Sequence, residues 1–356
     1  MLVVGTGLLG ASVGLALRRA DVDVLLEDTD DAARDEAVAR GAGRARRDGD
    51  VPVLVVVAVP PAAAGAVLAR ELARWPQATV TDVTSVKTRP LAQAVAAGGG
   101  AERLVGGHPM AGREVSGPGA ARADLFDDRV WVLTPLPGTE PERLEQVRAL
   151  VQTCGGLPVQ LAPEDHDRAV ALTSHSPQVL SSLLASRLAD AQQAYVEVSG
   201  QGLRDVTRIA ASDPALWAEI LGANATPVAD VLDVVAQDLA RVVDALRALG
   251  GSGADPEPRE VLVDVLARGN AGHARVPGKH GAEARPYVAV PVKVADRPGE
   301  LARLFVAAGD LGINLEDVRI EHVLGRPSGL VELAVRPAVA ADLVEGLRRR
   351  GFDVRA

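Results

Sequence analysis

Hydrophobic positions in the first 161 residues alternate between short continuous runs and segments with helical spacing. Continuous apolar runs are typical of buried parallel strands, and the helical patterns between them include Ala62–Arg74 and Glu140–Val151. This alternation predicts an α/β fold with a doubly wound sheet over residues 1–161. The strands expected are Leu2–Val4, Val22–Leu26, Pro52–Val59, Ala78–Val83, Arg103–Gly107, Val130–Thr134 and Pro158–Leu161.

The pattern changes over residues 162–250, where no strand-like run occurs. Two long helices are expected, Arg168–Ala191 and Pro227–Leu249. An all-helical domain of this size buries little core alone, so we expect it to dimerise with a second copy of the chain. The second helix carries apolar residues at helical spacing: Val228, Val231, Leu232, Val235, Leu239, Val242, Val243 and Leu246.

Residues 251–285 are rich in glycine and proline around a short helix, Pro258–Arg268, and are interpreted as a linker. Residues 286–356 then follow the order β-α-β-β-α-β of a ferredoxin-like unit. Its elements are expected at Tyr287–Ala295, Gly299–Leu311, Asn314–Val323, Leu330–Val335 after a Gly325–Gly329 turn, Ala340–Arg350 and a terminal strand.

The composition indicates a globular protein that handles small molecules. The 38 basic and 47 acidic residues give a net charge of −9, which argues against nucleic acid or an anionic membrane as the partner. The single cysteine, Cys154, excludes an internal disulfide and favours a reducing cytoplasm.

Met1 leads directly into a strand, so we expect no signal peptide. Pro60 and Pro61 split the uncharged run Val51–Ala69, which favours a strand and a helix over a membrane span.

A glycine-rich loop follows the first strand and predicts a Rossmann dinucleotide site. Its residues are Gly5, Thr6, Gly7, Leu8, Leu9 and Gly10. Such glycines allow a tight turn and close approach of a pyrophosphate to a helix N-terminus.

An acidic residue after the second strand bears on which cofactor the loop binds. Asp28 lies 23 residues after Gly5, near the spacing of the acid that binds the ribose diol, and a carboxylate there favours NAD over NADP. Glu27 is the alternative acid. NADP stays open because three arginines follow, Arg44, Arg46 and Arg47.

Ser85 and His108 both follow predicted strands and would meet at the carboxyl edge of the sheet, where doubly wound folds bind ligands. A neutral imidazole there is suited to accept a hydroxyl proton as hydride leaves. The alternatives are a structural histidine in a turn and a serine that only caps a helix. No metal site is expected.

The helical domain offers candidates for substrate binding. Arg204 and Arg208 share one helix face and suit carboxylate recognition, although a charged solvent-facing surface would look the same. His175 and Gln178, three residues apart, share another face or form a polar helix seam. His166, among acidic neighbours, is expected to cap a helix.

Together these motifs resemble the prephenate/arogenate dehydrogenase (TyrA) family of tyrosine biosynthesis. The resemblance covers essentially the whole chain, and its C-terminal part is similar to an ACT domain, in an arrangement like that of actinobacterial members. It is carried by the glycine loop, Asp82–Lys87, His108–Glu114, Thr173–His175, Gly202–Trp217, residues 275–281, Asp296–Leu301 and Gly312–Leu315.

The resemblance implies NAD-dependent oxidative decarboxylation of a cyclohexadienol. By matching position, His108 is the hydrogen-bond partner of the ring hydroxyl and Ser85 assists it, while Arg208 holds a substrate carboxylate. Further substrate-site residues implied are Glu114 and Asp205 in an ionic network around Arg208, Trp217 from the partner subunit, and His175, Gln178 and Arg204.

Two features leave the substrate and its regulation open. Gln178 stands where the family often has a histidine, so prephenate and arogenate both remain candidates, with prephenate predicted; Arg204 stands where some members have lysine. The ACT resemblance implies an aromatic amino-acid effector near Gly299 and Asn314 at a subunit interface, with tyrosine as the first candidate. The unit would otherwise serve dimerisation alone.

Two other functions fit a nucleotide-binding domain followed by helices. β-Hydroxyacid and 6-phosphogluconate-type dehydrogenases use a lysine in the helical domain, and this chain has none between residues 155 and 250. A catalytically inert NAD-dependent sensor would leave His108, Ser85 and Arg208 without a role.

Overall fold

The computed structural model describes all residues except 113–114, 252–255, 277–286, 323–327 and 356. Glu114, the end of the predicted linker and most of the predicted Gly325–Gly329 turn therefore lie outside the described residues. The chain forms two compact units, Met1–Ala236 and Gln237–Ala356.

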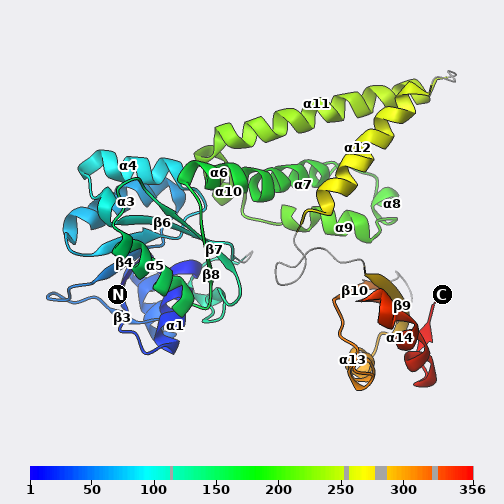
Figure 1. The fold of residues 1–356 in the computed structure, drawn as a ribbon, viewed down its shortest axis with the longest axis horizontal. Coiled ribbons are helices and arrows are strands. Elements are labelled where there is room, and N and C mark those ends of the chain that lie inside the picture. The colour runs from blue at the N-terminus through cyan, green and yellow to red at the C-terminus, as the bar shows by residue number, and fades with distance from the viewer. Residues whose placement is uncertain (113–114, 252–255, 277–286, 323–327, 356) are drawn as a thin grey trace. The chain divides into compact units, whose positions relative to one another are not determined.

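The first unit contains an eight-stranded sheet in the order β3-β2-β1-β4-β5-β6-β7-β8, in which only β6 and β7 pair antiparallel (Figure 1). The doubly wound sheet and all seven expected strands are confirmed. The sequence pattern missed β3, which is two residues long. The bounds are β1 Leu2–Val4, β2 Leu25–Glu27, β3 Arg44–Ala45, β4 Leu54–Val57, β5 Thr79–Asp82, β6 Leu104–Pro109, β7 Val130–Pro135 and β8 Leu157–Gln160.

Helices cover both faces of this sheet because successive strand residues point to opposite sides. Val3 and Val56 pack with α1, α2 and α5, whereas Val4 and Val57 pack with α3 and α4. None of the described helices is long and apolar enough to cross a membrane. The bounds are α1 Leu8–Arg19, α2 Asp31–Ala39, α3 Pro61–Arg74, α4 Thr88–Gly98 and α5 Pro141–Thr153, with 3₁₀ turns at Ala101–Arg103 and Pro118–Ala120.

The helical region is more broken than the sequence pattern predicts. The helical segment expected over Arg168–Ala191 is confirmed as far as Ser186, and it contains a π-helical turn, Ala171–His175, between α6 and α7 that the sequence pattern does not predict. Pro177 lacks an amide hydrogen and its ring clashes with the preceding turn, which accounts for the widened hydrogen bonding there. The bounds are α6 Pro163–Val170, α7 Ser176–Ser186, α8 Gln193–Val196, α9 Gln201–Thr207, a 3₁₀ turn at Arg208–Ala210, α10 Pro214–Ala223 and α11 Ala225–Leu249.

The C-terminal part begins with α12, Glu257–His273, five residues longer at its end than expected. An antiparallel four-stranded sheet follows in the order β10-β11-β9-β12, with the predicted sequence of elements. Its apolar face packs against two helices through Leu304 and Leu343. The bounds are β9 Val288–Ala295, α13 Glu300–Asp310, β10 Asp317–His322, β11 Ser328–Val335, α14 Pro337–Arg349 and β12 Asp353–Val354.

Candidate active site

The loop between β1 and α1 can be built only with glycine at two of its positions. Gly5 has a φ of +95°, and a Cβ there would lie 2.4 Å from the Ala58 carbonyl oxygen. A Cβ on Gly10 would lie 1.9 Å from the Gly5 carbonyl oxygen. Gly7, the N-terminal cap of α1, would place its Cβ in open space. The helix N-terminus, which begins at Leu8 and Leu9, is therefore accessible to a pyrophosphate, as a bound dinucleotide requires.

Asp28, directly after β2, is fixed against this loop. One oxygen, Oδ2, accepts hydrogen bonds from the Thr6 amide at 2.5 Å and the Thr6 hydroxyl at 2.8 Å. Burial raises the pKa of the Asp28 carboxyl, but the amides of Asp30 and Thr6 donate to it and leave the pKa lowered overall. The carboxylate is thus ionised and beside the place where a ribose would follow the pyrophosphate.

The alternative acid, Glu27, has other partners. Its two oxygens pair with Arg46 and Arg74, each at 2.7 Å. Arg44 is likewise paired with Asp50 at 2.8 Å. Because Arg44 and Arg46 both hold carboxylates, the geometry favours Asp28 and a cofactor without a 2′-phosphate. The side chain of Arg47 is exposed and has no ion pair among the described residues.

A pocket of about 420 Å³ lies at the carboxyl edge of the sheet, where β6 meets the helical region. Ser85, His108, His175 and Trp217 line it, together with Met110. Four residues predicted separately from two regions of the sequence are thus brought together. The remaining lining residues are Pro109, Ala111, Gly112, Thr173, Ser174 and Ile220, so no cation is among the residues that line the described pocket.

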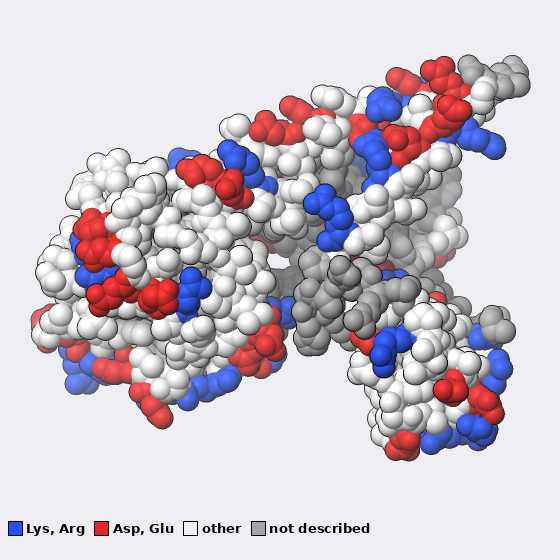
Figure 2. Space-filling model, viewed as in Figure 1, with Lys and Arg blue, Asp and Glu red and all other residues white. Residues whose placement is uncertain are grey.

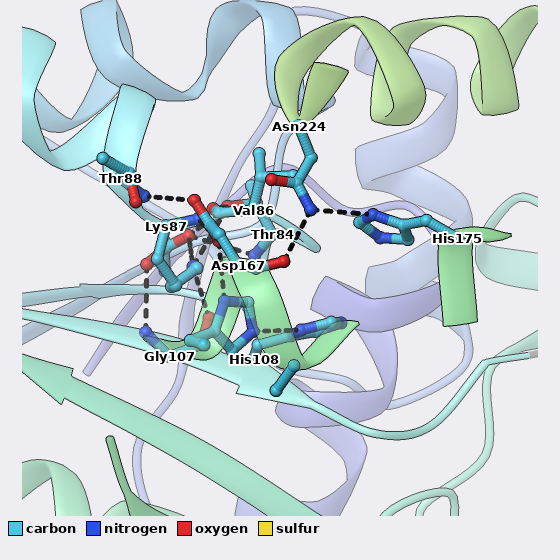
Figure 3. Close-up of polar contacts among 12 residues, drawn as sticks. Thr84, Val86, Lys87, Thr88, Gly107, His108, Asp167, His175 and Asn224 are labelled. Atoms are coloured by element: carbon cyan, nitrogen blue, oxygen red, sulfur yellow. Dashed lines mark hydrogen bonds and ion pairs between the residues drawn. The ribbon is translucent and has the colours of Figure 1, made fainter. Parts of the chain in front are cut away.

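His108 is the first member of a hydrogen-bonded chain that leads away from the pocket (Figure 3). Its Nδ1 lies 2.8 Å from Nε2 of the buried His166, and Nδ1 of His166 lies 2.8 Å from Oδ1 of Asp167. Asp167 also accepts from the main-chain amides of Lys87 at 2.8 Å and Thr88 at 2.9 Å, at the start of α4.

These contacts assign the protons on both imidazoles. Burial raises the pKa of Asp167, but its donors His166, Thr88 and Lys87 leave it lowered and ionised. His166 therefore donates from Nδ1, and its Nε2 accepts from Nδ1 of His108. The remaining nitrogen of His108, Nε2, is then an unprotonated acceptor. Burial, followed by the neighbouring His166, Lys87 and His175, lowers the pKa of His108 well below 6.5 and keeps the ring neutral.

His175 faces the same pocket with the opposite hydrogen-bonding capacity. The amide nitrogen of the buried Asn224 donates to the Asp167 carbonyl oxygen at 2.8 Å and lies 3.1 Å from Nδ1 of His175. His175 therefore carries its proton on Nε2, and burial lowers its pKa to about 4 against the opposing charge of Asp167. The pocket thus has an imidazole acceptor, His108, and an imidazole donor, His175.

Comparison with known proteins agrees with this geometry. Residues 13–159 match the family model described as “Prephenate dehydrogenase, nucleotide-binding domain”, and residues 162–263 match “Prephenate dehydrogenase, dimerization domain”. The chain is 39% identical to “Probable prephenate dehydrogenase NovF” of Streptomyces niveus over 99% of both chains. The chain belongs to the prephenate dehydrogenase family. The expected NAD-dependent oxidoreductase is therefore confirmed.

Two solved structures of this family resemble the chain over about three quarters of its length. The prephenate dehydrogenase of Aquifex aeolicus, in complex with hydroxyphenyl propionate and NAD⁺, has a TM-score of 0.65 and 26% identity, and covers 76% of this chain and 96% of its own. The arogenate dehydrogenase of Synechocystis has a TM-score of 0.63 and 27% identity, and covers 76% of this chain and 99% of its own.

Several predicted site residues do not reach the pocket of this chain. Arg204, Asp205 and Arg208 are exposed, and neither arginine has an ion pair among the described residues. Asp205 instead accepts from Gln201 at 2.7 Å. Gln178 is buried and donates to the Ser212 hydroxyl at 2.7 Å, which ties α7 to the segment before α10.

Trp217 of this chain lines the pocket, with its ring 6.0 Å from that of His175. The contribution of Trp217 by a partner subunit stays a prediction. One expectation at the site is wrong. His166 was expected to cap a helix, but the N-terminal cap of α6 is Ala162, and His166 is fully buried against His108.

Asp167 and Asn224, which contact His166 and His175, were not predicted as site residues. A histidine followed directly by aspartate at the start of a helix is a usable signal for a His–Asp pair. The approach of this pair to His108, 58 residues away, is visible only in three dimensions.

Proposed function

We propose that the protein is a prephenate dehydrogenase that converts prephenate and NAD to 4-hydroxyphenylpyruvate, carbon dioxide and NADH in tyrosine biosynthesis. The observation that carries this proposal is the neutral His108, whose Nε2 is left as an acceptor on a pocket at the same carboxyl edge of the sheet as the dinucleotide loop. NAD, when bound, supplies the hydride acceptor. The residues assigned to hold it are Gly5, Thr6, Gly7, Leu8, Leu9, Gly10 and Asp28.

His108 is assigned the proton of the ring hydroxyl. As the hydroxyl-bearing carbon loses hydride, its oxygen becomes a carbonyl and its proton moves to Nε2 of His108. The ring carboxylate then leaves as carbon dioxide, and its bonding electrons complete the aromatic ring. The oxygen becomes a phenolate and takes the proton back from Nε2 of His108, which gives the 4-hydroxyphenyl product and restores the neutral imidazole. Ser85 and His175, which line the same pocket, are assigned to hydrogen-bond that oxygen, Ser85 through its hydroxyl and His175 as a donor from Nε2.

A dianionic substrate needs a cation that the described pocket lining does not supply. Arg208 is proposed to bind a substrate carboxylate, with Arg204, Asp205 and Glu114 in the ionic network around it and Trp217 beside the ring. Arg208 is exposed and lacks an acidic partner among the described residues, so it is available for this role.

A second copy of the chain is the proposed means of completing the site. The helical region leaves several leucines largely exposed, among them Leu172 at 62% and Leu183 at 59%. An apolar surface of this kind, in a region that matches a dimerization domain, supports a homodimer. The proposed domains are 1–161 for NAD, 162–250 for substrate and dimerisation, 251–285 as linker and 286–356 for regulation.

Arogenate is the competing substrate. Gln178 is uncharged, donates its amide to Ser212 and does not line the pocket, so it offers no group that would select between a keto acid and an amino acid. The family contains a named arogenate dehydrogenase of comparable similarity. Initial rates of NADH release with prephenate and with arogenate, each with NAD and with NADP, test the proposal. We expect prephenate with NAD to be fastest, and turnover of neither substrate would refute it.

The C-terminal unit is proposed to be a ferredoxin-like ACT domain that binds an aromatic amino acid, with tyrosine first, near Gly299 and Asn314. Gly299 has a φ of +88° at the start of α13, and a side chain there would meet open space. Asn314 donates to Glu316 at 3.1 Å. Titration with tyrosine tests this proposal: we expect inhibition of turnover, whereas no binding of tyrosine would leave the unit with a structural role only.

The proposed location is the cytoplasm. The single buried thiol, Cys154, supports this location.

A further inference from the structure

Two fully buried side chains outside the pocket, Asp82 and Lys87, hold the residue that precedes His108. The Lys87 ammonium is ion-paired with Asp82 and donates to the Gly107 carbonyl oxygen at 2.6 Å and the Thr84 hydroxyl at 3.1 Å. Oδ1 of Asp82 accepts from the Gly107 amide at 3.0 Å. Both main-chain groups of Gly107 are thus held by one ion pair (Figure 3).

These hydrogen bonds to Gly107 take the place of main-chain hydrogen bonds between β5 and β6. The parallel pairing of β5 with β6 ends at Thr81 and Val105, whereas β6 continues to pair with β7 as far as Pro109. Beyond Val105 the side of β6 that faces β5 would be left without hydrogen-bond partners. The ion pair supplies those partners at Gly107.

The two glycines before His108 fit this arrangement. A Cβ on Gly106 would lie 2.2 Å from the Thr134 hydroxyl and 3.2 Å from Cδ of Lys87. A Cβ on Gly107 would lie 2.5 Å from the Asp82 carbonyl oxygen. A side chain at Gly107 would therefore clash with the main chain of β5, and one at Gly106 would clash with β7, so either would displace β6 next to His108.

Lys87 also holds His108 from the opposite side. Its main-chain amide donates to Asp167 at 2.8 Å, Asp167 contacts His166, and His166 contacts Nδ1 of His108. The contacts therefore form a closed ring that runs from His108 through His166, Asp167, Lys87 and Gly107 back to His108.

We propose that Lys87 and Asp82 are positioning residues that fix the imidazole of His108 for proton transfer. This inference rests on the proposed function only for the role of His108 in turnover. A misplacement of about 1 Å of a catalytic group can cost about 100-fold in rate, so the ring is expected to affect kcat rather than cofactor binding.

The test compares Lys87→Met with the double variant Asp82→Asn/Lys87→Met. Lys87→Met keeps the apolar stem but leaves the Asp82 charge unpaired in the interior, so its Tm should fall. The double variant removes that lone charge, so its Tm should recover toward that of the parent. In both variants the Gly107 carbonyl has lost its donor, and we expect kcat to be about 100-fold lower than in the parent, with Kd for NAD within about twofold.

The double variant separates positioning from folding. If its kcat recovers together with its Tm, the pair is structural only and the inference is overturned. A second readout needs no substrate: in protein with ¹³C-labelled histidine, the NMR titration of His108 should move to higher pH in both variants, because the positive charge of Lys87 is gone. An unchanged His108 titration would also overturn it. If the parent turns over neither prephenate nor arogenate, the proposed function fails, while the titration still decides this inference.

Discussion

At the scale of single residues, the site depends on the protonation of two histidines. His108 keeps Nε2 free because His166 accepts from its Nδ1, and His175 keeps a proton on Nε2 because Asn224 donates to its Nδ1. The sequence could identify Ser85 and His108, since residues that follow strands gather at one edge of a parallel sheet. It could not identify His166 or Asn224, because each acts through a contact with a residue distant in the chain.

His108→Asn should lower kcat by about 10²–10⁴-fold, the usual contribution of a positioned general base. Asparagine keeps polarity and approximate size but cannot accept a proton at neutral pH. Kd for NADH, measured by fluorescence, should stay within about twofold, since His108 does not touch the glycine loop. Turnover comparable with that of the parent would remove His108 from the mechanism.

The pH profile follows from the direction of the His108 pKa. Because the folded-state pKa lies well below 6.5, the ring stays neutral and active as pH falls through 6.5, and activity is lost only at lower pH. The logarithm of kcat/KM should therefore be flat from pH 8 to pH 6. An acidic limb centred at or above 6.5 would contradict the neutral, buried state of His108.

At the scale of elements, continuous apolar runs and glycine spacing were enough to predict the doubly wound sheet and the dinucleotide loop. The π-helical turn between α6 and α7, which carries Thr173, Ser174 and His175, was not predicted, because an α-helical pattern does not distinguish a single widened turn. Pro177 indicates a disturbed helical turn before it, but the pattern of apolar residues does not show which main-chain hydrogen bonds change.

The glycine loop gives a matched pair of substitutions. Gly10→Ala would force a Cβ to 1.9 Å from the Gly5 carbonyl oxygen, so the loop must shift. Overpacking of this kind costs about 1–3 kcal/mol and should lower Tm by several degrees while weakening NAD binding. Gly7→Ala meets no atom of the protein, so its Tm should match that of the parent, as measured by calorimetry. Equal Tm values for both variants would show that the loop is not packed as described.

At the scale of the whole molecule, the first unit carries the complete hydrogen-bonded chain of the site, but its proposed cation, Arg208, does not line the described pocket. The face drawn in Figure 2 carries acidic and basic side chains intermixed on both units, without an extended basic patch among the described residues of that face. The net charge of −9 likewise argues against a polyanion as the partner. The sequence predicted the order of elements in both units, since that order depends on local patterns. It could not show that Arg208 lies off the pocket, because that depends on the packing of short helices.

The final prediction concerns the second copy of the chain. Leu183, on α7, is 59% exposed, and Leu157, on β8, is 51% exposed in the nucleotide-binding part. Leu183→Asp should place a charge in the proposed interface and shift the protein from dimer to monomer in sedimentation velocity, with loss of prephenate turnover but retention of NAD binding. Leu157→Asp is the control, with the same change at similar exposure, and should leave the dimer and its turnover intact. A Leu183→Asp variant that is monomeric and fully active would show that one chain completes its own site, and Arg208 would then have to reach the pocket by a rearrangement of α9.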